Sequence, residues 1–162
     1  MFLKVARFID LLLVALTLGL TFCHALEIFG KMQLSSAEWL AVQQHLYNAF
    51  GPVGGMIELL SVVMTWTVFA MVLRRRPAKT LTLIASLCVT AALIVWFATV
   101  RPMNTVFNGW TAATMPVDWR TYRNQWETGH AVSAALFAVA FCGLVAALLA
   151  EIPEAGAVAP RA

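Results

Sequence analysis

Ionisable side chains within long apolar segments are costly and usually functional, and several occur near one end of such segments in this chain. His24 and Glu27 are one helical turn apart at the end of the first apolar segment, and Glu58 lies one or two turns inside the second. His130 opens the last one, and His45 lies between the first two. Imidazole and carboxyl groups at one depth predict either proton transfer with a bound substrate or a metal site.

Four residues around the start of the last apolar segment form a stripe. Trp119, Arg123, Trp126 and His130 recur at spacings of four, three and four, so they share one face of a helix with Asp118 as its N-cap. Two indoles, a guanidinium and an imidazole make a poor surface toward lipid and a good wall for a cavity that holds a flat aromatic ligand. The alternative is an interfacial belt of Trp and Arg that only anchors the helix.

Two pairs, His24 with Glu27 and Glu127 with His130, have the spacing that four-helix di-iron proteins use. Glu58 adds a carboxylate, but the third apolar segment supplies none. The main prediction is therefore a site without a metal or cofactor. One alternative is iron or copper bound through His24, Glu27, Glu58 and His130. Another is a haem between His24 and His130.

The composition indicates where these residues lie. Of the 162 residues, 61% are hydrophobic and 12% are charged, whereas soluble domains average about 45–50% and about 25%. This excludes a disordered protein, a coiled coil and a nucleic-acid-binding domain, and it argues against a soluble domain. We expect one membrane domain over residues 1–152 and a flexible tail over residues 153–162.

Four segments are long and apolar enough to cross a bilayer, for which a helix needs roughly 20 residues. A cleaved signal peptide is an alternative for the first of them, but it lacks a good cleavage site. The prediction is an all-α fold, a bundle of four transmembrane helices over Phe8–Ile28, Val53–Leu73, Leu81–Val100 and His130–Ala150.

Basic residues predict the orientation, because loops rich in Lys and Arg stay in the cytoplasm. With the N-terminus inside, seven lie on the inner side: Lys4, Arg7, Arg74, Arg75, Arg76, Lys79 and Arg161. Four lie on the outer side: Lys31, Arg101, Arg120 and Arg123. We therefore expect a multi-pass protein of the inner (cytoplasmic) membrane with both termini in the cytoplasm and the histidines at the outer end.

The first outer segment predicts an additional amphipathic helix. Ser35–Glu38 has the pattern of a capping box, in which the first and fourth residues bond to each other's backbone. The helix is expected on the membrane surface or over the mouth of the bundle, with Trp39 and Tyr47 at the interface. Its predicted apolar face consists of Trp39, Val42, Leu46 and Phe50.

Polar residues inside the spans predict contacts between helices. At the inner end, Asp10 is expected to pair with Arg7 on the same helix. Glu58 is either functional or a protonated hydrogen-bonding group. Hydrogen bonds between helices are expected for Ser61, Thr65, Thr82, Ser86 and Thr90.

The run Pro102-Met103-Asn104, then Trp110, then the Trp119-to-His130 stripe resembles the anthrone-oxygenase-like family of small four-helix membrane proteins. Many members are bacterial proteins of unknown function. The segment from Gly19 to Gly51 is also similar to bacterial members, so the resemblance covers nearly the whole chain. It implies the four-helix fold.

Named members are similar to enzymes that oxidise an anthrone to an anthraquinone with dioxygen. The resemblance implies an oxygen-dependent oxidoreductase for an anthrone- or quinol-like substrate, and it nominates as site residues Asn104, Trp119, Arg123, Trp126 and His130. We expect His130 to be the base, with Arg123 and Asn104 stabilising the enolate oxygen. His24 and Glu58 are expected in the same pocket, with the substrate held by Trp119, Trp126 and Trp110.

A second hypothesis is a non-catalytic membrane subunit or a protein that binds a small ligand, a metal or haem. A catalytic cluster would line a closed pocket, whereas a docking surface would be exposed. The expected partners are membrane lipid and a hydrophobic small molecule, with no nucleic acid, and an oligomer is left open.

Overall fold

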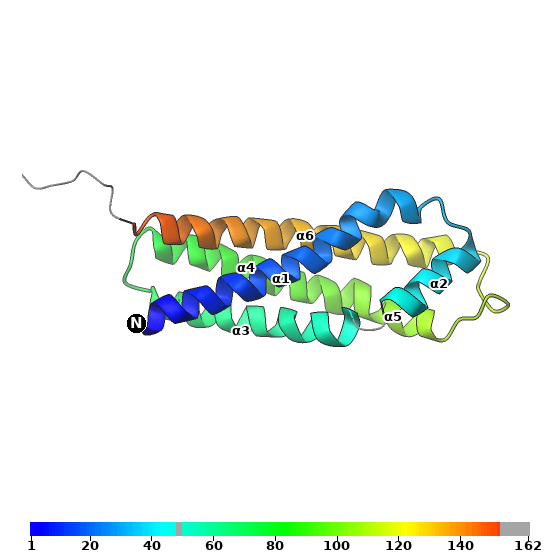
Figure 1. Ribbon diagram of the computed structural model, residues 1–162, viewed down its shortest axis with the longest axis horizontal. Coiled ribbons are helices and arrows are strands. Elements are labelled where there is room, and N and C mark those ends of the chain that lie inside the picture. Colours follow the sequence, from blue (N-terminus) through cyan, green and yellow to red (C-terminus); the bar gives the residue numbers. More distant parts are fainter. Residues whose placement is uncertain (48–49, 153–162) are drawn as a thin grey trace, which may run out of the picture.

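Four long helical segments run side by side and form a bundle (Figure 1). The computed structural model describes residues 1–47 and 50–152, and these contain no strand. Each segment is long and apolar enough to cross a membrane. The all-α four-helix prediction is confirmed, and the chain is a multi-pass membrane protein whose long α-helices are α1 (Phe2–Lys31), α3 (Gly55–Met71), α4 (Ala78–Val95) and α6 (Trp119–Leu149). The predicted tail, residues 153–162, lies outside the described residues.

Four shorter elements complete the chain: α2 (Ser36–Leu46), the π-helical turns η1 (Phe50–Gly54) and η2 (Trp96–Val100), and α5 (Arg101–Asn108). The third span was expected to end at Val100, but the helix continues through η2 and α5 to Asn108. Pro102 lies in the first turn of α5, directly after the π-helical turn η2, and it has no N–H to donate to a carbonyl of that turn. Helical structure therefore replaces part of the expected outer loop.

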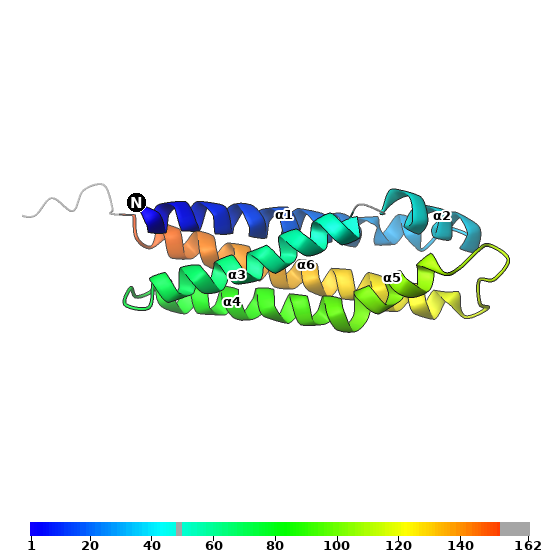
Figure 2. The ribbon, with the colours of Figure 1, turned by 90° about the horizontal axis from the view of Figure 1, so that it is seen from below.

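The lengths of the spans create an extension at one end. A helix rises about 1.5 Å per residue, so the segments of 30 and 31 residues are roughly 45 Å long, against about 30 Å of hydrocarbon. The segment Phe50–Met71 has only 22 residues. At the end opposite the N-terminus, α1, α5 and α6 extend beyond α3, and α2 lies there (Figures 1 and 2). We call this the α2 end of the bundle.

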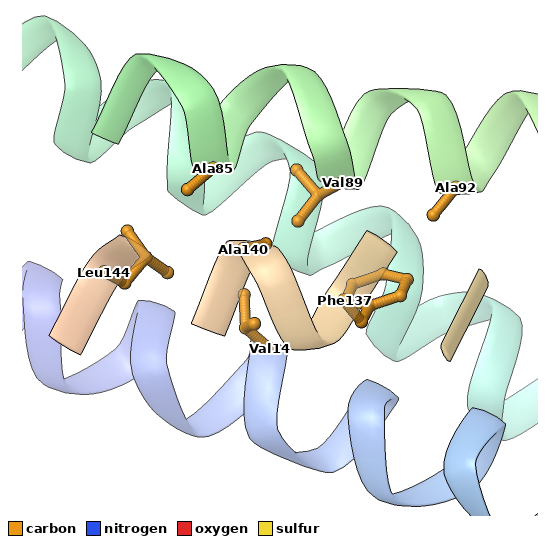
Figure 3. Close-up of a cluster of buried hydrophobic side chains, with 7 residues drawn as sticks. All are labelled: Val14, Ala85, Val89, Ala92, Phe137, Ala140 and Leu144. Carbon is orange, nitrogen blue, oxygen red and sulfur yellow. The ribbon is translucent and has the colours of Figure 1, made fainter. Parts of the chain in front are cut away.

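The middle of the bundle is held by apolar residues on α1, α4 and α6, and all but one of them are small or branched. Their side chains point toward one another between these helices (Figure 3). Small residues let helices approach closely in a membrane, where packing rather than the hydrophobic effect drives association. The cluster consists of Val14, Ala85, Val89, Ala92, Phe137, Ala140 and Leu144.

Gly129 marks the closest approach of α6 to η2. A Cβ atom at this position would overlap the Thr99 hydroxyl and lie 2.7 Å from Cγ2 of Val100. Both contacts are shorter than van der Waals distance, so only glycine fits without movement of the neighbouring segment. This contact fixes η2 against the part of α6 that carries His130.

The end near the N-terminus differs from prediction. Arg7 does not pair with Asp10; its Nη1 lies 2.8 Å from Oε2 of Glu151, just beyond α6. This hydrogen bond lowers the pKa of the Glu151 carboxyl. Asp10 faces the bundle interior and accepts a hydrogen bond of 2.7 Å from Thr65 on α3. Adjacent turns of one helix therefore direct these two charged groups to different partners.

The predicted Ser and Thr contacts are confirmed only in part. Thr65 bonds to Asp10 of α1, and Ser86 of α4 lies 3.4 Å from the Thr65 carbonyl oxygen of α3. The Ser61 hydroxyl instead donates to a carbonyl of its own helix. Thr90 also donates within α4, while it accepts a hydrogen bond from Trp66 of α3.

The capping box is confirmed at the start of α2. Ser35 Oγ accepts from the Glu38 N–H, and the Ser35 N–H donates to Glu38 Oε2 at 2.9 Å. The predicted apolar face is wrong except for Trp39, because α2 buries Trp39, Leu40 and Gln43. Leu46, a member of that face, is 64% exposed.

The position of Trp39 explains the difference. Trp39 is fully buried rather than interfacial, and its ring packs 4.8 Å from Phe107 of α5 and 5.7 Å from Trp119 of α6. The helix thus covers the mouth of the bundle, one of the two places expected for it.

Candidate functional site

A cavity of about 220 Å³ lies in the α2 half of the bundle. A single water needs only about 10–15 Å³ of such volume, so the cavity has room for an organic ligand. Its aromatic walls are Tyr47, Phe50, Trp96, Phe107 and Trp126, and its polar lining includes Thr17, Thr21, His24, Gln43, Glu58, Asn104, Asn108, His130 and Ser133.

Both π-helical turns line this cavity. Phe50, Gly51, Pro52 and Gly54 of η1 and Trp96 of η2 all contribute to its wall. In η2 the Arg101 N–H donates to the Trp96 carbonyl, one residue further back than in an α-helix. Such wide turns occur often at functional sites, because they displace the helix and open space beside it.

The two cavity histidines are in contact across the bundle. His24 of α1 and His130 of α6 have ring centroids 4.2 Å apart at an interplanar angle of 37°. The Trp126 ring lies 4.3 Å from His130 and 5.0 Å from His24. The structure thus places together two histidines that are more than 100 residues apart in sequence.

Asn104 is oriented by a neighbour. The Trp126 indole Nε1 donates a hydrogen bond of 2.7 Å to Asn104 Oδ1. An indole nitrogen can donate a hydrogen bond but cannot accept one, so the amide oxygen of Asn104 must face it. The Asn104 NH₂ group remains to donate to a ligand in the cavity that this residue lines.

Three polar side chains of the cavity wall are buried with an unsatisfied atom. Glu58 is only 4% exposed, and its Oε1 has no hydrogen-bond partner among the described residues. The same holds for Oγ of Ser133 and Nε2 of Gln43. An unsatisfied buried group costs about 1–3 kcal/mol. Three such groups around one cavity indicate a place for a ligand or for water.

Lys31 also lies beside the cavity, although the sequence analysis does not name it as a site residue. It is 4% exposed, and its Nζ lies 3.0 Å from Glu27, 3.7 Å from Glu127 and 3.3 Å from Nδ1 of His24. The sequence contains the signal, since Lys31 is four residues after Glu27 and seven after His24, on one helical face. The positive-charge rule uses Lys31 only as a basic residue of the outer side.

Tyr47 is the second functional candidate that sequence reasoning did not assign to the site. Its ring lies 4.6 Å from that of His24, and its hydroxyl donates to Glu27 Oε2 at 2.5 Å. Burial and this hydrogen bond raise the pKa of the Tyr47 phenol well above its usual value. The group therefore stays protonated and supports the wall beside His24.

Three predicted site residues lie away from the cavity. The Arg123 guanidinium stacks 5.0 Å over Trp119 and lines a separate groove between α1 and α6. Trp119 belongs to the aromatic cluster around Trp39, and the Trp110 ring packs 5.3 Å from Tyr122. Of the predicted set, the cavity wall contains His24, Glu58, Asn104, Trp126 and His130.

The stripe on α6 is divided by height. Trp119 and His130 share a face, but eleven residues separate them by roughly 16 Å along the helix. The half near Trp119 packs under α2, and the half near His130 reaches the cavity. The helical spacing therefore predicted that these side chains point in the same direction, but it did not show that they lie at different depths. Asp118 is at the N-cap position, but its side chain makes no capping hydrogen bond.

The metal and haem alternatives find limited support in the geometry. Within residues 1–47 and 50–152, no three His, Cys, Asp or Glu side chains are grouped so that they could hold a metal ion. Glu27 is already engaged by Lys31 and Tyr47. The rings of His24 and His130 touch, so they would have to separate before a haem could lie between them.

Comparison with known proteins adds no assignment: no family model, curated protein or solved structure matches this chain.

Proposed function

We propose that this protein is an oxygen-dependent oxidoreductase of the membrane that acts on a hydrophobic aromatic substrate, such as an anthrone or a quinol. One observation carries the proposal: two histidines, a buried glutamate and an oriented asparagine line one aromatic-walled cavity. The proposal also uses the resemblance to the anthrone-oxygenase-like family.

The first step is removal of a proton from carbon. An anthrone has a CH₂ group between two aromatic rings, and a base that takes one of its protons leaves an electron-rich enolate. His130 is our candidate base, because a neutral imidazole accepts a proton near neutral pH. Aromatic side chains in the cavity wall, such as Trp96 and Trp126, suit flat rings.

The second requirement is stabilisation of the negative charge on the enolate oxygen. The Asn104 NH₂ group is a donor held in place by Trp126. We assign no such role to Arg123, which lies in a separate groove. A preorganised donor in a water-poor site typically contributes a factor of about 10²–10³ in rate.

The overall reaction balances without another reductant. The enolate carbon gives electrons to dioxygen and forms a C–O bond. Loss of water then leaves the second carbonyl, so one anthrone and one O₂ give one anthraquinone and one H₂O. The scheme requires no resident metal or haem, and metal analysis with a visible spectrum of the purified protein tests that part of the proposal.

Oxygen uptake by the purified protein with a model anthrone is the direct test. We expect uptake and quinone formation in a one-to-one ratio, above the uncatalysed rate. The control is the His130→Ala variant, which keeps the aromatic walls. Absence of oxidation by the wild-type protein, together with tight binding of the anthrone, would support the alternative of a non-catalytic ligand-binding protein.

We also propose that the protein lies in the inner membrane with its termini and the short α3–α4 turn in the cytoplasm. The support is the cluster Arg74–Arg76 in that turn, against fewer basic residues at the α2 end. The cavity then faces the outer side. In this orientation a lipid-soluble substrate enters from the outer half of the bilayer.

Cysteine labelling tests the orientation. In a variant with its three cysteines replaced by Ala, we expect Ala112→Cys to react with an impermeant maleimide on intact cells. Arg76→Cys should react only after permeabilisation. Both positions are exposed, so access depends on the side of the membrane. The reverse labelling pattern contradicts the proposed orientation.

A further inference from the structure

Lys31 is a buried lysine beside the cavity that the proposed reaction does not use. We propose that Lys31 holds His24 in the tautomer with its proton on Nε2, so that His24 is a hydrogen-bond donor and His130 the base. The assignment of the tautomer is independent of the reaction, whereas the division of roles rests on the proposed function.

The Nζ atom of Lys31 lies 3.3 Å from Nδ1 of His24. A lysine ammonium has three N–H donors and no acceptor. The Nδ1 atom facing it must therefore accept a hydrogen bond and be unprotonated. A neutral imidazole carries one proton, which then lies on Nε2, on the opposite side of the ring.

The competing partner is Glu27, whose Oε2 lies 3.6 Å from the same Nδ1. This oxygen is closer to Lys31, at 3.0 Å, and it also accepts the hydrogen bond from Tyr47. A proton on Nδ1 would set two donors face to face at 3.3 Å. A bare Nδ1 lets the ammonium lie between two acceptors, which favours the Nε2–H tautomer.

The surroundings hold the Lys31 side chain in place. Glu27 and, at 3.7 Å, Glu127 are carboxylates from two different helices. The Nζ atom also lies 4.7 Å from the centroid of Tyr47 and 4.8 Å from that of Trp126, positions that suit cation–π attraction. A buried ammonium needs such compensation. With partners on several sides, it has little freedom to leave Nδ1.

A fixed tautomer gives the two touching histidines different chemistry. His24 lines the cavity with an Nε2–H that donates, and His130 remains available to accept a proton. His24 therefore joins Asn104 as a donor for negative charge on the substrate. This is the role that the sequence predicted for Arg123. Lys31 itself is a positioning residue, since it does not line the cavity.

Nitrogen NMR of protein labelled with ¹⁵N-histidine tests the tautomer directly, because protonated and bare imidazole nitrogens resonate far apart. The signals of His24 are identified by their loss in His24→Gln. We expect protonated Nε2 and bare Nδ1 in the wild type and in Lys31→Arg, which also only donates. In Lys31→Met we expect a shift toward protonated Nδ1, with Lys4→Met, an exposed lysine on the same helix, as the control.

Two results overturn the inference: protonated Nδ1 in the wild type, or an unchanged tautomer in a folded Lys31→Met variant. If Lys31→Met does not fold, the wild-type spectrum still decides. For the division of roles, Lys31→Met should lower kcat by about 10² with little change in KM, as expected for loss of one donor. A wild-type protein that oxidises no anthrone refutes the proposed function and leaves the spectral result intact.

Discussion

Trp126 and Asn104 are joined by a hydrogen bond of 2.7 Å from the indole Nε1 to the amide Oδ1, which connects α6 to α5 at the cavity wall. The contact changes the expected role of Trp126. It was predicted to hold the substrate with its ring, and it also decides which end of the Asn104 amide faces the ligand. If the proposed function holds, the Trp126 indole therefore contributes through its N–H as well as through its ring surface.

This relationship predicts a non-additive pair of variants. Asn104→Ala should lower turnover by about 10², since it removes a donor to the enolate oxygen. Trp126→Phe should lower it by no more than about tenfold, because a neutral hydrogen bond contributes about 0.5–1.5 kcal/mol. The double variant should be no worse than Asn104→Ala, since Trp126 acts here through Asn104. Steady-state oxygen uptake gives the three rates.

Trp66→Phe is the matched control, because it removes another indole donor, bonded to Thr90 on α4 and away from the cavity. Its turnover should stay at the wild-type level. Strictly additive losses in the Trp126 and Asn104 variants would show that the indole acts independently of the amide.

His130 and Arg123 are two turns apart on one helix, and the geometry predicts opposite results for them. His130→Ala should lower turnover by about 10²–10⁴, the usual contribution of a general base. Arg123→Lys should leave turnover unchanged, because its guanidinium stacks on Trp119 outside the cavity. The sequence analysis instead expects Arg123 to stabilise the enolate oxygen, and in that case Arg123→Lys would impair activity.

The measurement is kcat for each variant at matched thermal stability, with the exposed His45→Ala as a control for loss of an imidazole. A large loss in Arg123→Lys with normal folding would return that residue to the catalytic set. Normal turnover in His130→Ala would exclude it as the base.

The fold was predictable because the hydropathy and the length of a segment can be read from consecutive residues. An apolar segment near 20 residues must cross the bilayer, and a capping box starts a helix from its own four residues. The bounds were less accurate where helices leave the membrane. Hydropathy falls at Arg101 and Trp119, but both residues remain in helices that extend to the α2 end.

The lining of the cavity was predictable for residues whose position depends on their depth in the membrane. His24, Glu58 and His130 lie at one end of their spans and meet in one cavity. Trp119 and Arg123 share the face of His130, but α2 folds over that height of α6, which no local pattern indicates. Lys31 was not predicted for a similar reason. Its positive charge fitted the expected orientation in the membrane, and its burial depends on partners from α6.

Glu58 allows a test of whether a residue that lowers the stability of the fold is kept for function. Its Oε1 is buried without a partner among the described residues, so Glu58→Leu should stabilise the protein by about 1–3 kcal/mol. The same variant should lose activity, because the cavity loses its only lining carboxyl group among the described residues. Thermal unfolding in detergent and oxygen uptake measure the two effects.

Ser61→Ala is the control for this prediction, since it lies one turn further along α3 and its hydroxyl bonds only to its own helix. It should change neither quantity much. If Glu58→Leu is instead strongly destabilised, the carboxyl group has a structural role and the functional interpretation fails.

Gly129→Ala tests the close approach of α6 to η2. The added methyl group would overlap the Thr99 hydroxyl and crowd Val100, and such overpacking costs about 1–3 kcal/mol. Gly19→Ala on α1 is the matched control, because nothing lies within 4 Å of a Cβ there. It should be neutral or stabilising by up to about 1 kcal/mol, the helix propensity difference.

A second substitution tests whether the contact with Thr99 causes the loss of stability in Gly129→Ala. Thr99→Ala in the Gly129→Ala background should recover part of the lost stability, because it removes the hydroxyl that the new methyl group meets. The same substitution alone should cost little, since the Thr99 hydroxyl bonds only to a carbonyl of its own helix. Thermal unfolding of the four proteins completes the cycle. Equal losses in both backgrounds would mean that Gly129 is required for a reason other than this contact.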